Sequence, residues 1–304
     1  MKTVLTLLLV IIASAGLCFA QASGNIGYSQ SGGNARAREN ERAKRILSQG
    51  ELPPTGTSTF VDASVLMNVP ADEHVAVFGV MQECRTVLEC NQKMDATVES
   101  FTGKLKQLGI GSSDLFVDFA AQNKIYDYVV TGDLAKEQLV GFELKKNVSV
   151  HYKDKGLLDS IIIAASQSNI FDLIKVDYIV RDMTAIQNRL SEEAARIIKQ
   201  KAARHESQLG IKLRDPVQVH AERPSIYFPT TMYDSYTAFE SENVDGRYDR
   251  EKFTVQQARK SRTFFFNALS ADGFDYVINP IVIEPVVQFT LYLRVKYETT
   301  EQTK

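Results

Sequence analysis

Apolar residues along this 304-residue chain repeat with two different periods. From Val287 to Tyr297 every second residue is apolar, which is the pattern of a strand with one buried face and one wetter face. From Met94 to Leu108 the apolar residues instead recur at steps of three and four, as in an amphipathic helix. A chain that changes between these periods packs helices on sheets, so we expect an α+β fold.

The same patterns predict the remaining elements. Strands are expected near residues 61–67, 74–81, 115–121, 124–130, 140–152 and 173–180. The strand at 287–297 is expected to pair with one of these early strands and to close the domain. Helices are expected from the capping box at Thr86 to Gly109, from Asp154 to Ser168, from the capping box at Thr184 to Leu209, and over Glu251–Ala268.

The first twenty residues predict export. Lys2 precedes an apolar run from Val4 to Ala15, and small residues follow up to Ala20, which is typical of a secretory signal peptide. Cys18 offers a lipoprotein alternative, but Leu17 disfavours it because lipid attachment needs a small residue there. Beyond Ala20 no apolar run reaches eighteen residues, so we expect no transmembrane helix after signal removal. The expected location is the periplasm, ahead of outer-membrane association or secretion.

The rest of the chain divides into a lead segment, a domain and a tail. Residues 21–58 are rich in Gly, Ser and Asn and contain a short basic helix candidate, Asn34–Leu47. That helix is either attracted to an anionic surface or part of a solvated tether, and its narrow apolar face favours the tether. Residues 59–297 form the predicted domain, and residues 298–304 are expected to be a loose tail.

The charge balance argues against a nucleic-acid partner. The chain has 35 Lys and Arg residues against 37 Asp and Glu residues, a net charge of −2 at pH 7. Binding to phosphates needs a clustered positive field, which this mixed composition does not supply.

Cys84 and Cys90 are the two cysteines after the predicted signal peptide. The capping box at Thr86 places Cys84 just before a helix and Cys90 in its first turn, where the two residues pack closely. A disulfide and a pair of buried free thiols both remain open. A metal site is disfavoured because no histidine lies at ligand spacing from either cysteine.

Motifs that would indicate catalysis are missing from the sequence. There is no nucleophile elbow, zinc-protease helix or phosphate-binding loop, so we expect no enzyme, no cofactor and no metal. A hydrolase would need a histidine in a pocket with a nucleophile and an acid. The candidates for that alternative are His74, His151, His205 and His220.

Several segments, taken in order, resemble the SIMPL-domain family, which includes bacterial periplasmic and outer-membrane immunogenic proteins. The similar segments are the turn Pro70–Asp72 into Val75–Val80, the helix with Asn91 and Met94 that ends in Leu108–Ile110, Tyr126–Tyr128, Gly141–Phe142, and the helix with Ala194 and Ala202 that ends in Leu209–Ile211. The resemblance implies a SIMPL-like domain with a mostly antiparallel sheet packed by two long helices and one shorter helix. It also implies no established enzymatic activity, self-assembly in some members, and a loose link to envelope stress.

Residues 222–279 differ from the family pattern and read as an enlarged insertion. They contain the densest aromatic stretch of the chain, which is a candidate contact surface: Tyr227, Phe228, Tyr233, Tyr236 and Phe239. Exposed aromatic side chains would stack on sugar rings or anchor a neighbouring subunit, whereas buried ones would form a flap on the core.

Two functional hypotheses follow. The first is a non-enzymatic, exported cell-envelope protein that acts by self-assembly or binding, as a homo-oligomer or with an envelope protein or glycan. The alternative is a glycan- or peptide-binding module that uses the aromatic residues of the insertion.

Overall fold

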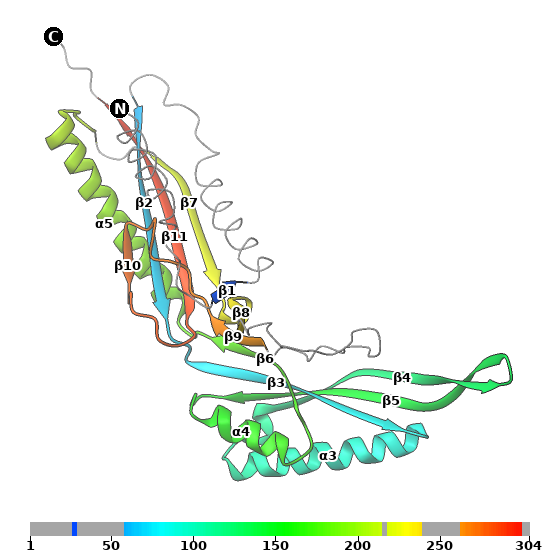
Figure 1. Cartoon of the computed structure of the whole chain (residues 1–304). Coiled ribbons are helices and arrows are strands. Elements are labelled where there is room, and N and C mark those ends of the chain that lie inside the picture. Colours follow the sequence, from blue (N-terminus) through cyan, green and yellow to red (C-terminus); the bar gives the residue numbers. More distant parts are fainter. Residues whose placement is uncertain (1–25, 29–57, 215–217, 239–261, 300–304) are drawn as a thin grey trace, which may run out of the picture. The chain divides into compact units, whose positions relative to one another are not determined.

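The computed structural model describes residues 26–28, 58–214, 218–238 and 262–299 (Figure 1). The fold is α+β, as the two periods predicted, and its sheets are mostly antiparallel, as the family resemblance implied. The predicted signal peptide, the basic helix candidate and the end of the tail lie outside the described residues. None of the helices within the described residues is both long and apolar enough to span a membrane.

The chain divides into two compact units. The smaller unit comprises Met1–Leu47 and Asp234–Phe265, and the larger comprises Ser48–Tyr233 and Phe266–Lys304. The described strands of the smaller unit form one sheet in the order β1-β8-β9, with β1 antiparallel to β8. Their bounds are β1 (Ile26–Tyr28), β8 (Tyr233–Ala238) and β9 (Arg262–Phe266).

The first sheet of the larger unit has the order β4-β5-β3-β6, and all its described pairs are antiparallel. Two helices, α3 (Val87–Gln107) and α4 (Leu157–Ser166), cover one of its faces (Figure 1). The strands are β3 (Glu73–Cys84), β4 (Leu115–Thr131), β5 (Leu134–Tyr152) and β6 (Asp172–Ile179).

The core under α3 follows the predicted stripe. Met94, Phe101 and Leu105 are buried, and Phe101 meets Phe78 of β3 edge to face, with ring centroids 5.4 Å apart. The predicted cap is also confirmed, because the Glu89 backbone N–H donates to the Thr86 hydroxyl at 3.2 Å. These contacts hold α3 against β3 and β5.

The second sheet of the larger unit has the order β10-β2-β11-β7. Helix α5 (Met183–Leu209) packs on it through Ile186, Leu190 and Ala194. The pair β10–β2 is parallel and the other pairs are antiparallel. The strands are β2 (Ser58–Val69), β7 (Gln218–Tyr227), β10 (Tyr276–Ile278) and β11 (Val287–Glu298). Strands β7 and β10 come from the residues predicted to belong to the insertion or to border it.

Strand β11 confirms the predicted alternation and the predicted long-range pairing. It pairs with β2 along its whole length, from Val287 opposite Val69 to Glu298 opposite Ser58. The predicted wet face is wrong at Arg294, which is 7% exposed, and at Gln288, which is fully buried. Its side-chain amide donates to Asn68 Oδ1 at 2.6 Å and accepts from the Leu269 backbone N–H at 2.6 Å, which satisfies its polar groups.

Three other expectations need correction. Helix α5 is capped by Asp182, whose carboxylate accepts from the Ala185 backbone N–H at 2.8 Å, and not by Thr184. The two strands expected between 115 and 130 form one strand, β4, with an irregular register between Phe119 and Ala121. The helix expected at Glu251–Ala268 is wrong over its described part, because residues 262–266 form the strand β9.

Candidate functional site

Strands β4 and β5 extend past the rest of the first sheet as a two-stranded hairpin arm, defined here as residues 125–141 (Figure 1). Strand β3 pairs with β5 from Phe142 onward, so among the described strands the arm residues of β5 pair with β4 alone. Gly132, with φ of 60°, turns the chain at the tip, where a side chain would be strained.

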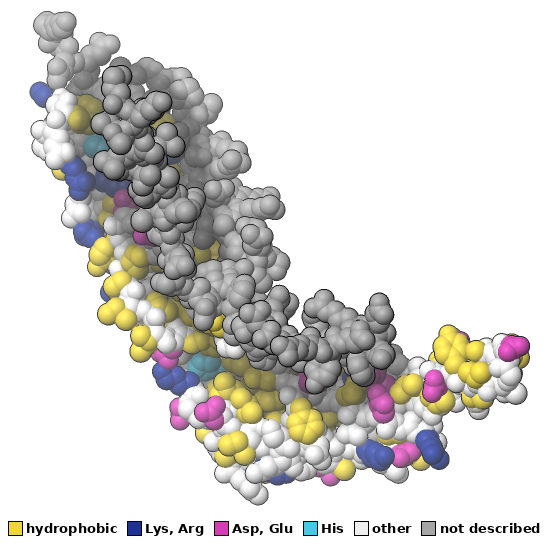
Figure 2. Space-filling model, in the orientation of Figure 1, with side chains coloured by type: hydrophobic (Ala, Val, Ile, Leu, Met, Phe, Trp, Pro, Cys, Tyr) yellow, Lys and Arg dark blue, Asp and Glu magenta, His cyan; other side chains and the backbone are white. Residues whose placement is uncertain are grey.

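The arm carries apolar side chains that contact solvent. Val130 and Leu134, beside the tip, are each 68% exposed. Figure 2 shows hydrophobic side chains gathered near the end of the arm. The exposed apolar and aromatic residues of the arm are Tyr126, Tyr128, Val129, Val130, Leu134, Leu139 and Val140. Such a concentration on a two-stranded ribbon indicates an interaction surface.

The two edges of the first sheet differ. At the β6 edge, the Thr230 hydroxyl donates to the Val176 carbonyl at 3.1 Å, from a short 3₁₀ helix at Pro229–Thr231. At the β4 edge, the described strands provide no neighbour other than β5. Phe116 and Phe119 near the start of β4 are also exposed. The β4 edge therefore offers both backbone groups and apolar side chains to another chain.

The predicted aromatic surface is only partly assembled. Phe228 is 46% exposed and Tyr233 is 43% exposed, whereas Tyr227 is half-buried in β7. Tyr236 is half-buried in β8, in the smaller unit, and Phe239 lies outside the described residues. The described members of this set are not packed in the core.

One cluster of charged side chains lies on the face of the first sheet that carries His151. His151 Nδ1 lies 2.8 Å from Asp114 Oδ1, and its Nε2 lies 3.3 Å from Glu73 Oε2. Arg181 also pairs with Glu73. The hydrogen bond to Asp114, helped by Glu73, raises the pKa of His151 against the opposing effect of burial. Arg181 holds the pKa of Glu73 below its usual range, and His151 does the same for Asp114.

His74 lies on the opposite face of the same strand pair. It faces Tyr152 across the ladder, while its neighbour Val75 faces His151. Its ring stacks on Tyr152 with centroids 5.2 Å apart and meets the edge of Tyr178 at 5.3 Å. Burial is the main cause that lowers the pKa of His74, so the imidazole is neutral at pH 7.

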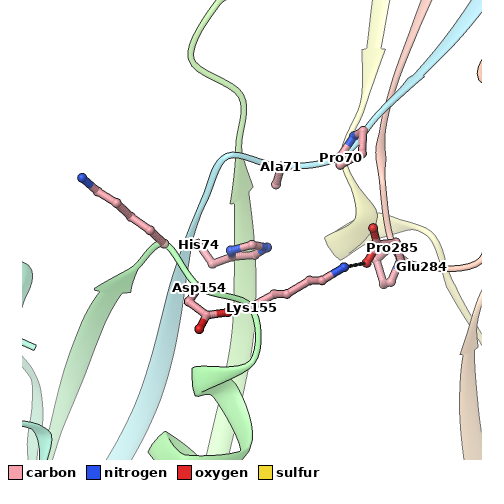
Figure 3. A pocket seen from close by; sticks show the side chains of 8 residues that line it. Pro70, Ala71, His74, Asp154, Lys155, Glu284 and Pro285 are labelled. Carbon is pink, nitrogen blue, oxygen red and sulfur yellow. Dashed lines mark hydrogen bonds and ion pairs between the residues drawn. The ribbon is translucent and has the colours of Figure 1, made fainter. Parts of the chain in front are cut away.

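A cavity of about 270 Å³ opens beside His74 (Figure 3). Its lining residues come from the turn between β2 and β3, from β3, from the segment after β5 and from the segment before β11. They are Pro70, Ala71, His74, Lys153, Asp154, Lys155, Glu284 and Pro285. The Lys155 ammonium is paired with the Glu284 carboxylate, as the dashed line in Figure 3 shows.

The four histidines proposed for a hydrolase do not meet at one site. His205 belongs to α5, and His220 of β7 packs against Phe60 with ring centroids 4.9 Å apart. His74 reaches the cavity, whose lining contains no Ser, Thr or Cys among the described residues. Within the described residues no three His, Cys, Asp or Glu side chains are grouped to hold a metal ion.

Cys84 and Cys90 are joined as a disulfide, with their Cα atoms 5.3 Å apart. The bond links the end of β3 to the first turn of α3. Sequence reasoning identified this pair but missed three other features: the hairpin arm, the cluster around His151 and the cavity beside His74. Each of them depends on strand pairing or on loops distant in sequence.

Comparison with known families identifies one match. The model of the SIMPL family, described as "Protein of unknown function (DUF541)", matches residues 60–259. The comparison with curated proteins found no match.

Proposed function

Because this chain belongs to the SIMPL family, to which no function is assigned, we propose a function from its own surface. The protein is a non-enzymatic, exported cell-envelope protein that acts by self-assembly, and its hairpin arm is the contact between copies. The observation that carries this proposal is the row of exposed apolar side chains on the arm, beside the open edge of β4.

Physical chemistry favours a partner for this arm. A two-stranded ribbon is marginally stable in water unless a further strand or layer covers it. Burying a valine or leucine side chain gains about 1.5–3 kcal/mol, so covering Val130 and Leu134 alone is a substantial driving force. A second copy brings an arm of the same kind and an edge of the same kind, which permits a symmetric contact.

The proposed cellular location rests on the sequence. The predicted signal peptide at Met1–Ala20 supports export, with the periplasm as the destination. A disulfide between Cys84 and Cys90 fits an oxidising compartment, where such bonds persist. A role in envelope maintenance or stress agrees with the family resemblance.

The non-enzymatic part of the proposal is supported by the chemistry of the two polar sites. In the cluster around His151, the imidazole lies between the carboxylates of Asp114 and Glu73, and Glu73 also pairs with Arg181. The cavity beside His74 is lined without a hydroxyl or thiol side chain in the described part. Among the described residues, neither imidazole is hydrogen-bonded to a serine, threonine or cysteine side chain, which is the contact that activates such a nucleophile.

The test is the solution mass of the chain from Gln21 onward, measured by light scattering after gel filtration. We expect a discrete assembly. The double variant Tyr128→Lys, Val130→Lys places charges on the arm and should yield monomers. The control, Phe171→Lys, changes an exposed aromatic residue away from the arm and should keep the assembly. A monomer at tens of micromolar for the unmodified protein would refute self-assembly.

A second candidate is the glycan- or peptide-binding module. It is favoured by the exposure of Phe228 and Tyr233, whose rings are accessible for stacking. Binding to envelope glycan fragments and to peptides is measured for the unmodified protein and for Phe228→Ala and Tyr233→Ala. Affinity that falls in both variants supports the module, and equal affinity in all three removes it.

A further inference from the structure

We infer that the cavity beside His74 binds a small zwitterion of the size of a free amino acid or a dipeptide. This inference is independent of self-assembly, because the cavity and the hairpin arm share no residue. Three observations carry it: the charges at the cavity, the buried imidazole in its wall, and its size and rigidity.

The lining carries charges of both signs at close range. Lys155 supplies an ammonium group, and Asp154 and Glu284 supply two carboxylates. The ammonium group of Lys153, which also belongs to the lining, lies instead 3.8 Å from Glu73 Oε1. An apolar ligand would remove these charges from water without replacing their interactions, which is costly. A ligand with a single charge would match only one of the two signs. A ligand with an ammonium and a carboxylate group complements both the Lys155 ammonium group and the carboxylates.

The ion pair between Lys155 and Glu284 shows how the charges are presented. It joins the segment after β5 to the segment before β11, across the cavity (Figure 3). The ammonium side chain of Lys155 and the carboxylate of Glu284 are partly exposed, at 68% and 36%. Exposed ion pairs of this kind contribute little stability, so a bound zwitterion can replace each partner at small cost.

His74 supplies a directional contact. It is 8% exposed, and its Nδ1 has no hydrogen-bond partner among the described residues. A buried polar atom without a partner is unfavourable and is uncommon in folded proteins. Because the neutral imidazole offers one donor and one acceptor, it can bind either end of a zwitterion.

The size and walls of the cavity limit the ligand. Ligand pockets generally measure about 300–1,000 Å³, so a cavity of about 270 Å³ lies just below that range. Pro70, Ala71 and Pro285 form walls with restricted backbones or short side chains. These walls favour a compact ligand and disfavour a long chain or a large ring.

The experiment is an NMR titration of the ¹⁵N- and ¹³C-labelled chain from Gln21 onward. L-alanine and L-alanyl-L-alanine are the zwitterionic probes. N-acetyl-L-alanine carries only the carboxylate, L-alaninamide only the ammonium group, and N-acetyl-L-alaninamide neither charge. We expect saturable shifts at the His74 ring and at the Ala71 and Lys155 amides with the zwitterions. The singly charged probes should bind at least tenfold more weakly, and the neutral probe should cause no shift.

Variants separate the site from a general charge effect. Lys155→Met and Glu284→Gln should each weaken binding at least tenfold, and His74→Gln should also weaken it. Lys106→Met, on the exposed side of α3, is the matched control and should bind as the unmodified protein does. Because Lys155 and Glu284 are partly exposed, their variants remain informative if His74→Gln does not fold.

Three outcomes would overturn the inference. The first is the absence of shifts with both zwitterions at tens of millimolar. The second is equal binding of L-alanine and N-acetyl-L-alanine, which would indicate a site for anions. The third is full binding by both Lys155→Met and Glu284→Gln. None of these outcomes bears on the light-scattering test of self-assembly.

Discussion

At the scale of single residues, His151 links stability to pH. Its pKa is raised in the folded state, so its contribution is fully present below the unfolded pKa of about 6.5 and is lost as the pH rises through the folded value. The pKa values of Glu73 and Asp114 are lowered, so their contribution is lost as the pH falls through those values. Stability should therefore be greatest in mildly acidic solution.

This dependence can be measured by thermal unfolding between pH 5 and pH 9. We expect the melting temperature to fall as the pH rises above 6.5, and the fall should be smaller in His151→Gln. His205→Gln, on α5, is the control and should retain the full dependence. If the melting temperature of His151→Gln falls with pH as steeply as that of the unmodified protein, His151 is not the source of the dependence. The His151 ring should also titrate above its ordinary pKa by NMR.

Two glycines make a matched pair for packing. A Cβ atom on Gly141 would lie 2.7 Å from the Cys84 backbone oxygen, too close for any real contact, so Gly141→Ala should destabilise the fold by about 1–3 kcal/mol. A Cβ atom on Gly103, inside α3, would meet nothing within 4 Å, so Gly103→Ala should stabilise it by about 0.5–1 kcal/mol. Urea unfolding measures both, and equal effects would disprove the argument.

The sequence allowed us to predict contacts between residues close together in the chain, but not contacts between residues on different strands. The Thr86 cap was predictable because its partner, Glu89, is three residues away. The cluster of Glu73, Asp114 and His151 was not, since these residues meet only through the pairing of β3 with β5 and the turn before β4. The predicted cap at Thr184 is wrong because α5 begins earlier: Asp182 caps it, and Thr184 lies inside the helix.

At the scale of elements, the disulfide fixes the junction of β3 and α3. Cross-linking residues six apart stabilises a fold by about 2 kcal/mol in the chain-entropy model. The double variant Cys84→Ser, Cys90→Ser should therefore have a free energy of unfolding, measured in urea, that is lower by about that amount. A reducing agent should destabilise the unmodified protein but not the variant. Alkylation and mass spectrometry of the purified protein report the bond directly, and two alkylated thiols without reduction would contradict it.

Apolar alternation predicts a strand best where a helix packs on one face of the sheet. The alternation in β11 is clear because α5 covers only one face of its sheet. The segment 262–266 was predicted to be helical from the spacing of apolar residues, but its run of Phe264–Phe266 suits a strand. Single-sequence periodicity could not separate the two, because the segment is short and its partner β8 is distant in the chain.

At the scale of the whole molecule, the family match and the folding unit have different ends. The match stops at residue 259, yet β11 lies between β2 and β7 in the second sheet and buries Val287, Phe289 and Leu291. A chain truncated after residue 259 should lose the second core. Its far-UV circular dichroism should show reduced structure, and limited proteolysis should digest α5. A chain ending at Thr299 retains β11 and is the control; equal resistance of both chains would refute this view.

The pairing of Ser58 with Glu298 also sets an order of events during synthesis. All the strands and helices of the first sheet lie between residues 73 and 179, so that sheet can form while the chain is still growing. Strand β2 emerges before them, but it must wait for β11, more than two hundred residues later. Contacts this distant in sequence form slowly. During synthesis, therefore, the first sheet is able to fold while β2 lacks its full-length partner until β11 has been made.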